Sequence, residues 1–184
     1  MKKKVSYLFF LSICFLITLT SCGTTRQTIQ TIQGNYVVKN KITTNTPYDK
    51  VWEHIIDFFA ENSIPIGVIS KESGLITANS VSFSGDQVSY EDKNGEINNQ
   101  YAWFVLPYSK NVVGGRATCS FNVRVKANDD KTTTIYVNLS NLIGYYNIEV
   151  LNTLTFEKQA IQGEYQVECK STGQFERELL YIFR

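Results

Sequence analysis

The chain has 184 residues, of which 43% are hydrophobic and 19% charged, and its formal net charge is +1 at neutral pH. Its 18 basic residues are balanced by 17 acidic ones, which excludes the strongly basic surface on which nucleic-acid binding depends. The length suits one domain with a sizeable hydrophobic core.

The first residues have the three-part layout of a secretory signal peptide. Lys2, Lys3 and Lys4 provide a positive start, and an apolar run of 15 residues follows from Val5 to Leu19. A membrane-spanning helix needs roughly 20 apolar residues, whereas this run is shorter and contains two serines. We therefore predict a signal peptide over residues 1–21, with an uncleaved anchor helix as the alternative.

The run closes with Leu19-Thr20-Ser21-Cys22, which resembles the lipobox of bacterial lipoproteins. In that family the Cys thiol is alkylated by diacylglycerol, the chain is cut before the Cys, and the new amine is acylated. The resemblance implies that Cys22 is a lipid anchor and no catalyst, because two or three acyl chains hold a protein on a bilayer where one does not.

The residues after Cys22 indicate which membrane holds the protein and on which side it lies. Gly23 occupies the position at which an Asp retains a lipoprotein at the inner membrane, and no acidic residue lies between Cys22 and Tyr48. The resemblance therefore implies lipid anchoring to the outer membrane, with the protein on the periplasmic side.

We interpret residues 22–33 as a lipidated tether and residues 34–184 as a single domain. The segment GTTRQTIQTIQ lacks helical or strand periodicity, and when fully extended it reaches about 36 to 40 Å. Without residues 1–21 the chain keeps 15 basic and 17 acidic residues, a formal charge of −2. This charge gives no reason to expect a nucleic-acid partner.

The segment TPYDKVWEHIIDFFAEN predicts an amphipathic helix. Thr46 is a candidate N-cap, Pro47 stands near the first helical position, and Asp49 lies in the first turn. At about 100° per residue, one side of the helix is apolar: Val51, Trp52, Ile55, Ile56, Phe58 and Phe59. The segments PIGVIS and LITANSVSF, joined by a KESG turn with Gly74, then predict a hairpin for this helix to lie on.

The strongest strand signals come in the second half of the chain. Residues 117–125 alternate between apolar and polar side chains without a break, and residues 132–140 alternate again after a turn that contains Asp129 and Asp130. A third alternating stretch covers residues 164–169.

A second helix is expected to close the chain. Ser171 and Gln174 fit a capping box, and four apolar residues follow at helical spacing: Phe175, Leu179, Ile182 and Phe183. Together the elements predict the α+β class, as an antiparallel twisted sheet with an N-terminal and a C-terminal helix packed on one face.

This order is similar to the helix-grip domains of the lipoprotein C subunit of the outer-membrane β-barrel assembly machinery. The resemblance rests on YDKVWEHIIDFFAENSIPI, on KESGLITA after it and on the closing helix, and it covers only part of the chain. A second likeness is to uncharacterised bacterial lipoproteins with a C-x-S-T-G segment before a helix, here Cys169, Ser171, Thr172 and Gly173. The first resemblance implies a helix-grip-like arrangement, and the second implies no activity.

Two cysteines remain for the folded domain. Cys14 leaves with the signal peptide and Cys22 takes the lipid, so Cys119 and Cys169 are left in an oxidising compartment. Each stands on the apolar phase of its strand, and we predict a disulfide if the two strands are neighbours. It would stabilise the fold by about 4 kcal/mol in the entropic account. The alternative is two separate buried thiols.

Residues that carry catalysis or bind metals are scarce. His54 is the only histidine, and on the predicted helix it falls toward the polar flank, as a surface residue would. The acidic stretch SYEDKNGEI does not have the spacing of a calcium loop, and Asn94-Gly95 fits a hairpin turn better. We therefore predict a protein that is not an enzyme and has no catalytic residue, metal site or cofactor.

Three segments carry apolar or aromatic residues beyond what the simple sheet needs: residues 102–108, 141–146 and 147–156. They either form another strand around Trp103 and the edge of the core, or place Tyr108, Tyr145 and Tyr146 along a binding groove or partner surface.

Two functions follow from this pattern. The first is a membrane-anchored interaction or scaffolding module with an envelope protein as partner, and the second is a carrier of a small apolar ligand or lipid between helix and sheet. A carrier needs a cavity of roughly 300 Å³ or more there. The sequence predicts no oligomeric state.

Overall fold

The computed structural model describes residues 30–110, 112–151, 158–181 and 183. The predicted signal peptide and Cys22 lie outside these residues, as do the last residues of the segment 147–156. The elements are β1 (Lys41–Thr44), α2 (Tyr48–Glu61), β2 (Val68–Ser70), β3 (Leu75–Ser84), the 3-10 turn η1 (Gly85–Gln87), β4 (Val88–Tyr90), β5 (Phe104–Leu106), β6 (Val112–Ala127), β7 (Thr133–Leu151), β8 (Lys158–Val167), β9 (Lys170–Ser171) and α3 (Gln174–Tyr181).

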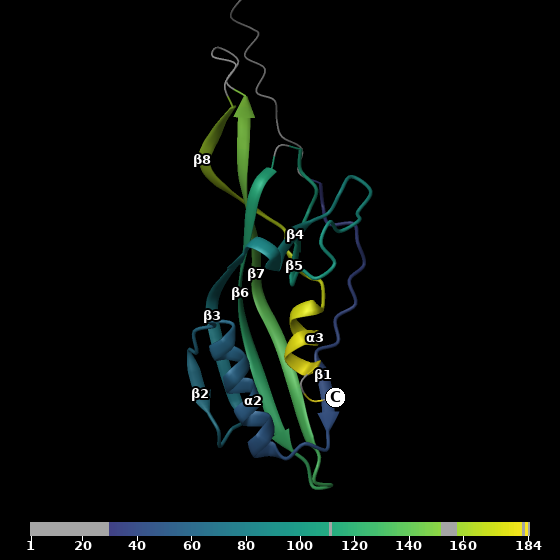
Figure 1. Cartoon of the computed structure of the whole chain (residues 1–184), viewed down its shortest axis with the longest axis vertical. Coiled ribbons are helices and arrows are strands. Elements are labelled where there is room, and N and C mark those ends of the chain that lie inside the picture. The colour runs from purple at the N-terminus through teal and green to yellow at the C-terminus, as the bar shows by residue number, and fades with distance from the viewer. Residues whose placement is uncertain (1–29, 111, 152–157, 182, 184) are drawn as a thin grey trace, which may run out of the picture.

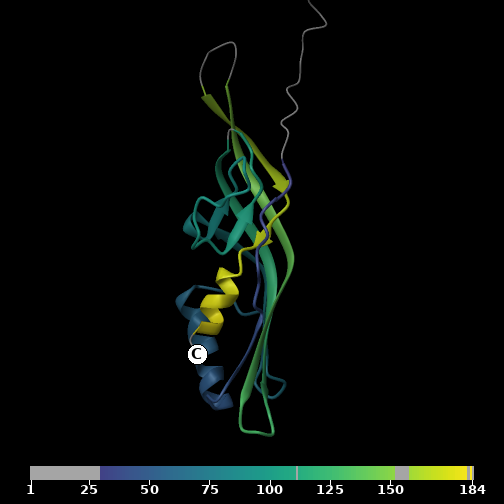
Figure 2. The same cartoon turned by 90° about the vertical axis from the view of Figure 1, so that its right-hand side faces the viewer.

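A long antiparallel sheet forms one layer of the molecule (Figure 1). Its strands lie in the order β1-β7-β6-β3-β2, and β8 pairs with the later part of β7, from Gly144 to Leu151. The two helices lie on the same face of this sheet (Figure 2). The predicted α+β class with a mostly antiparallel sheet and two helices is therefore confirmed.

The predicted alternation along β6 is confirmed. Every second residue of this stretch is buried: Ala117, Cys119, Phe121, Val123 and Val125. The register nevertheless shifts between Thr118 and Ser120 opposite β7, and between Ala78 and Val81 on β3. These irregularities lie at one level of three neighbouring strands, and bulges of this kind increase the local twist of a sheet.

Helix α2 has the predicted buried face but not the predicted cap. Val51, Trp52, Ile55, Phe58 and Phe59 are buried on it. The residue before the helix is Pro47, which makes no side-chain cap, and the hydroxyl of the expected cap Thr46 instead lies 3.0 Å from that of Thr44. The hairpin after α2 forms as predicted, with Gly74 at a φ of +67° in its turn.

Helix α3 also begins differently from the prediction. The Thr172 hydroxyl oxygen accepts the N–H of Gln174 at 3.2 Å, and the Ser171 hydroxyl donates to the Glu176 carboxylate at 2.8 Å. The Gln174 side chain donates to Glu178 at 2.7 Å. The predicted Ser171–Gln174 capping box is therefore wrong, because Glu176 takes the place of Gln174 as the partner of Ser171.

Aromatic rings fill the space between the helices and the sheet. Phe59 of α2 lies 5.4 Å from Phe121 of β6, and Phe175 of α3 lies 5.0 Å from the same ring, measured between ring centroids. Phe58 and Phe83 join the cluster at 6.1 and 6.2 Å from Phe175. One hydrophobic core thus holds both helices against β6 and its neighbours.

A second, small sheet covers the same face beyond the helices (Figure 2). Its order is β4-β5-β9, with β4 parallel to β5 and β5 antiparallel to β9. It packs on the long sheet through Leu106, because a Cβ on Gly144 would come within 2.3 Å of the Leu106 side chain. The sequence predicted a strand around Trp103 to Val105, but not that this strand belongs to a separate sheet.

Candidate interaction surface

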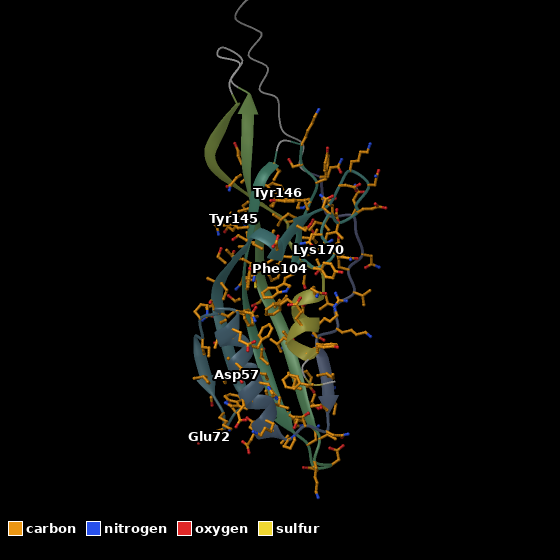
Figure 3. The ribbon with its side chains drawn as sticks, in the orientation of Figure 1. Asp57, Glu72, Phe104, Tyr145, Tyr146 and Lys170 are labelled. Carbon is orange, nitrogen blue, oxygen red and sulfur yellow. The ribbon has the colours of Figure 1, made fainter. Side chains whose placement is uncertain are left out.

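The three tyrosines predicted to line one groove or surface do not lie on one surface. Tyr146 is 0% exposed, and its hydroxyl donates to the carbonyl of Pro107 in the core. Tyr145, the residue before it on β7, is half-buried (both are labelled in Figure 3). The Arg116 guanidinium lies 4.0 Å from the centroid of the Tyr145 ring. The prediction fails for Tyr146 because neighbouring residues of a strand point to opposite faces.

Tyr108 follows Pro107, whose carbonyl the buried Tyr146 hydroxyl binds. Its side chain is partly buried, and its carbonyl accepts the N–H of Gln30 at 3.4 Å. It therefore belongs to the place where the chain enters the described structure.

The two cysteines are buried free thiols in the structure. Cys169 lies between β8 and β9 and belongs to neither strand, so strand pairing does not decide whether it can reach Cys119. The structure has both as free thiols, and the disulfide stays a prediction from the sequence.

Burial controls the chemistry of both thiols. It raises the pKa of Cys119 to about 12, with the negative charge of Glu176 as the second cause. Burial also raises the pKa of Cys169, and the charge of Cys119 adds to the effect. Both groups are therefore protonated at neutral pH, and a protonated thiol is neither a nucleophile nor a metal ligand.

A buried carboxylate holds the N-terminal segment on the domain. Glu91 follows β4 and is 2% exposed. It accepts the backbone N–H groups of Gln33 at 2.8 Å and Gly34 at 2.7 Å, and the Tyr36 hydroxyl at 2.9 Å. Burial, and then the hydrogen bond to Glu91, raise the pKa of Tyr36.

The same segment has a second attachment. The N–H of Ile32 donates to Glu168 at 3.1 Å, and Ile32 is itself buried. The sequence placed residues 30–33 in the tether because they are polar and aperiodic, whereas contacts with the domain begin at Gln30. We call residues 30–36 the strap.

The free edge of the long sheet at β2 is apolar. β2 pairs with β3 on one side, and no strand among the described residues pairs with its other side. Val68 and Ile69 are each 52% exposed, and Ile66 is 39% exposed. We call Ile66, Val68 and Ile69 the apolar edge. The sequence predicted this hairpin but could not show which of its strands would lie at the edge of the sheet.

His54 lies on the outside of α2, as predicted, and its ring stands 6.0 Å from that of Phe183. Within the part of the chain that the structure describes, no three His, Cys, Asp or Glu side chains come together in a way that could hold a metal ion. No described helix is long and apolar enough to cross a membrane.

No protein-family model matches the chain, and no curated protein matches its sequence.

Proposed function

We propose that this protein is a membrane-anchored bacterial lipoprotein that acts as a non-enzymatic interaction module of the cell envelope. The observation that carries the proposal is the apolar edge. A free edge strand presents unpaired backbone N–H and C=O groups, and proteins usually protect such an edge with charged residues or proline. Pro65 and Lys71 stand on either side of this edge, but β2 itself has neither a charge nor a proline, and its Val68 and Ile69 are exposed, as is Ile66 before it.

The partner that fits this edge is an extended segment of another envelope protein. Such a segment adds to a sheet as a further strand, with main-chain hydrogen bonds for affinity and side-chain contacts for specificity. Val68 and Ile69 are neighbours in the strand, so they offer apolar contacts on both faces of the added segment.

The anchor in this proposal is the lipid on Cys22, at the outer membrane and facing the periplasm. The lipobox resemblance supports it. The position of α2 and α3 on one face of the sheet supports the helix-grip-like arrangement that the resemblance to the assembly-machinery lipoprotein implies. The strap then sets where the tether ends and the rigid domain begins.

We do not extend the proposal to a carrier that holds its ligand between α2 and the sheet. The rings of Phe59 and Phe121 lie 5.4 Å apart there, and Phe58, Phe83 and Phe175 fill the neighbouring space. A carrier of that design would need an open cavity of about 300 Å³ or more at this position.

Photo-crosslinking in living cells tests the interaction module. A photoreactive amino acid in place of Val68 is expected to crosslink the full chain to one envelope protein, and the same amino acid in place of Asp57, on the outer side of α2, is not. Ile69→Lys should abolish the Val68 crosslink, because a charge on a free edge opposes strand addition. Equal crosslinking from both positions, or no effect of Ile69→Lys, would refute the proposal.

Fractionation tests the anchor separately. Cys22→Ala is expected to release the protein from membranes or to mislocalise it, because the short tether offers no other attachment. If the variant still fractionates with membranes after a high-salt wash, lipidation does not hold the protein there.

A further inference from the structure

A groove lies between α3 and the segment that leads into β1, at the edge of the sheet opposite the apolar edge. Its volume is about 550 Å³, and the residues that line it are Val37, Lys39, Lys41, Ile42, Gly173, Arg177 and Leu180. Pockets for small molecules commonly have volumes of roughly 300 to 1,000 Å³. The groove is therefore large enough for a ligand, and it involves none of the residues of the apolar edge.

One side of this groove is basic. Lys39 and Arg177 contribute two positive charges, and no carboxylate is among the lining residues. The Lys41 ammonium lies instead 5.1 Å above the centroid of the Tyr136 ring, on the face of the sheet opposite the core-facing Ile42, so its charge is not directed into the groove. The Arg177 guanidinium donates to the neutral Gln174 side chain. Among the described residues, the ion pairs that form lie elsewhere and leave Lys39 and Arg177 uncompensated.

The other part of the groove is apolar. Val37 is 75% exposed, and Ile42 and Leu180 line the groove with it. Ile42 also lines a second hollow of about 650 Å³, whose other lining residues are mostly polar: Thr43, Thr44, Asn45, Thr46, Pro47 and Phe183. The two hollows thus share a wall and follow one another along the same edge.

We propose that this groove binds a single-chain anionic amphiphile, with its headgroup between Lys39 and Arg177 and its tail over Val37, Ile42 and Leu180. Two uncompensated cations select a phosphate or carboxylate head, because charge-assisted hydrogen bonds to these groups are stronger than neutral ones. The apolar part requires a hydrocarbon tail, which a free inorganic anion lacks. This site is separate from the proposed edge interaction and does not depend on it.

Native mass spectrometry of the full chain, released from neutral detergent micelles, tests the proposal. The probes are lysophosphatidylglycerol, palmitate, lysophosphatidylcholine with its zwitterionic head, and inorganic phosphate. We expect one molecule of lysophosphatidylglycerol or palmitate to bind at least roughly tenfold more tightly than lysophosphatidylcholine or phosphate. Binding of palmitate alone, or of lysophosphatidylglycerol alone, supports the site and identifies the headgroup as carboxylate or phosphate.

Variants assign the binding to this groove. Lys39→Gln with Arg177→Gln should weaken amphiphile binding by roughly tenfold or more, since each removes a charged contact. Lys110→Gln, which removes an exposed cation outside the groove, should change nothing. If the double variant loses its circular-dichroism spectrum, Val37→Ser on an exposed residue replaces it and should weaken binding through the tail.

Three results would overturn the proposal. Equal binding of lysophosphatidylcholine and lysophosphatidylglycerol would show adsorption through the tail alone. Binding of inorganic phosphate as tight as that of lysophosphatidylglycerol would show a simple anion site. Unchanged binding in the Lys39 and Arg177 variant and in Val37→Ser would place the amphiphile elsewhere on the chain.

Discussion

Tyr145 and Tyr146 show how strongly two adjacent residues can differ within one strand. Tyr146 is fully buried, and its hydroxyl satisfies the Pro107 carbonyl, while Tyr145 is half-buried beside Arg116. Replacing both residues together would therefore test folding and any surface role at once. Single replacements separate the two roles.

We expect Tyr146→Ala to lower the free energy of unfolding by roughly 3 to 5 kcal/mol, as truncation of a buried aromatic residue does. Tyr146→Phe should cost about 1 to 3 kcal/mol, because the Pro107 carbonyl loses its partner in the core. Tyr145→Ala is the matched control and should cost clearly less than Tyr146→Ala. Urea unfolding measures all three, and equal effects at the two positions would contradict the burial described above.

Because the thiols are buried, the free energy of unfolding is expected to fall at alkaline pH. The pKa of Cys119 is about 12 in the folded chain against an ordinary value of 9.0, so folding favours the protonated thiol. The stabilisation is complete below about pH 9 and is lost as the pH rises toward 12, because the unfolded thiol ionises first. The loss can reach roughly 1.4 kcal/mol per pH unit for one such group.

Unfolding measured from pH 7 to pH 11 checks this dependence. Stability should fall above about pH 9, and Cys119→Ala should make the fall shallower, because alanine carries no proton to lose. In the folded protein at pH 8 neither Cys119 nor Cys169 should react with a thiol reagent. After denaturation without a reductant both should be labelled, since both are free. If both cysteines stayed unlabelled after denaturation, the result would instead support the disulfide predicted from the sequence.

Helices and strands with a long, regular pattern of apolar and polar residues could be predicted from the sequence. Strands whose place depends on which other strands they pair with could not. The buried faces of α2 and β6 follow from helical and alternating spacing alone. Phe104–Leu106 is buried at every position, which gives no period, so its place in a second sheet could not be read from the sequence.

The candidate sites could not be predicted from the sequence either, because each depends on residues that are far apart in the chain. The strap is polar and aperiodic, and it is ordered by the distant acceptors Glu91 and Glu168. The apolar edge depends on the order of strands, which the local sequence does not contain. The groove beside α3 joins residues of the chain segment before β1 to residues near the C-terminus, so no local motif marks it.

The strap gives a prediction at the scale of an element. Glu91→Ala removes the acceptor of three hydrogen bonds, each worth about 1.5 to 3 kcal/mol when one partner is charged. Hydrogen exchange of the Gln33 and Gly34 amides should then become much faster, while β6 stays protected. Glu96→Ala, an exposed carboxylate in the neighbouring turn, is the control. Unchanged exchange in Glu91→Ala would show that other contacts hold the strap.

At the scale of the whole molecule, the strap determines how the domain is presented to the membrane. The chain enters the described structure at Gln30, in the half of the molecule where β7 and β8 project, and the turn between β6 and β7 lies at the opposite end (Figure 1). β7 has 19 residues, so it spans about 60 Å at roughly 3.3 Å per residue. From Cys22 to Gln30 an extended chain reaches at most about 29 Å.

If Cys22 carries the lipid, the end near Gln30 should lie closer to the membrane than the β6–β7 turn. Lys93 marks the near end, since the neighbouring Gly95 lies against the Gln33 side chain, and Asp129 marks the far turn. Fluorophores attached through Lys93→Cys and Asp129→Cys, in lipidated protein on vesicles with an acceptor lipid, should give more efficient energy transfer from position 93. The buried native thiols stay unlabelled in the folded chain. Equal transfer from both positions would mean that the domain tumbles freely on its tether, and stronger transfer from position 129 would mean that the membrane contacts the opposite end.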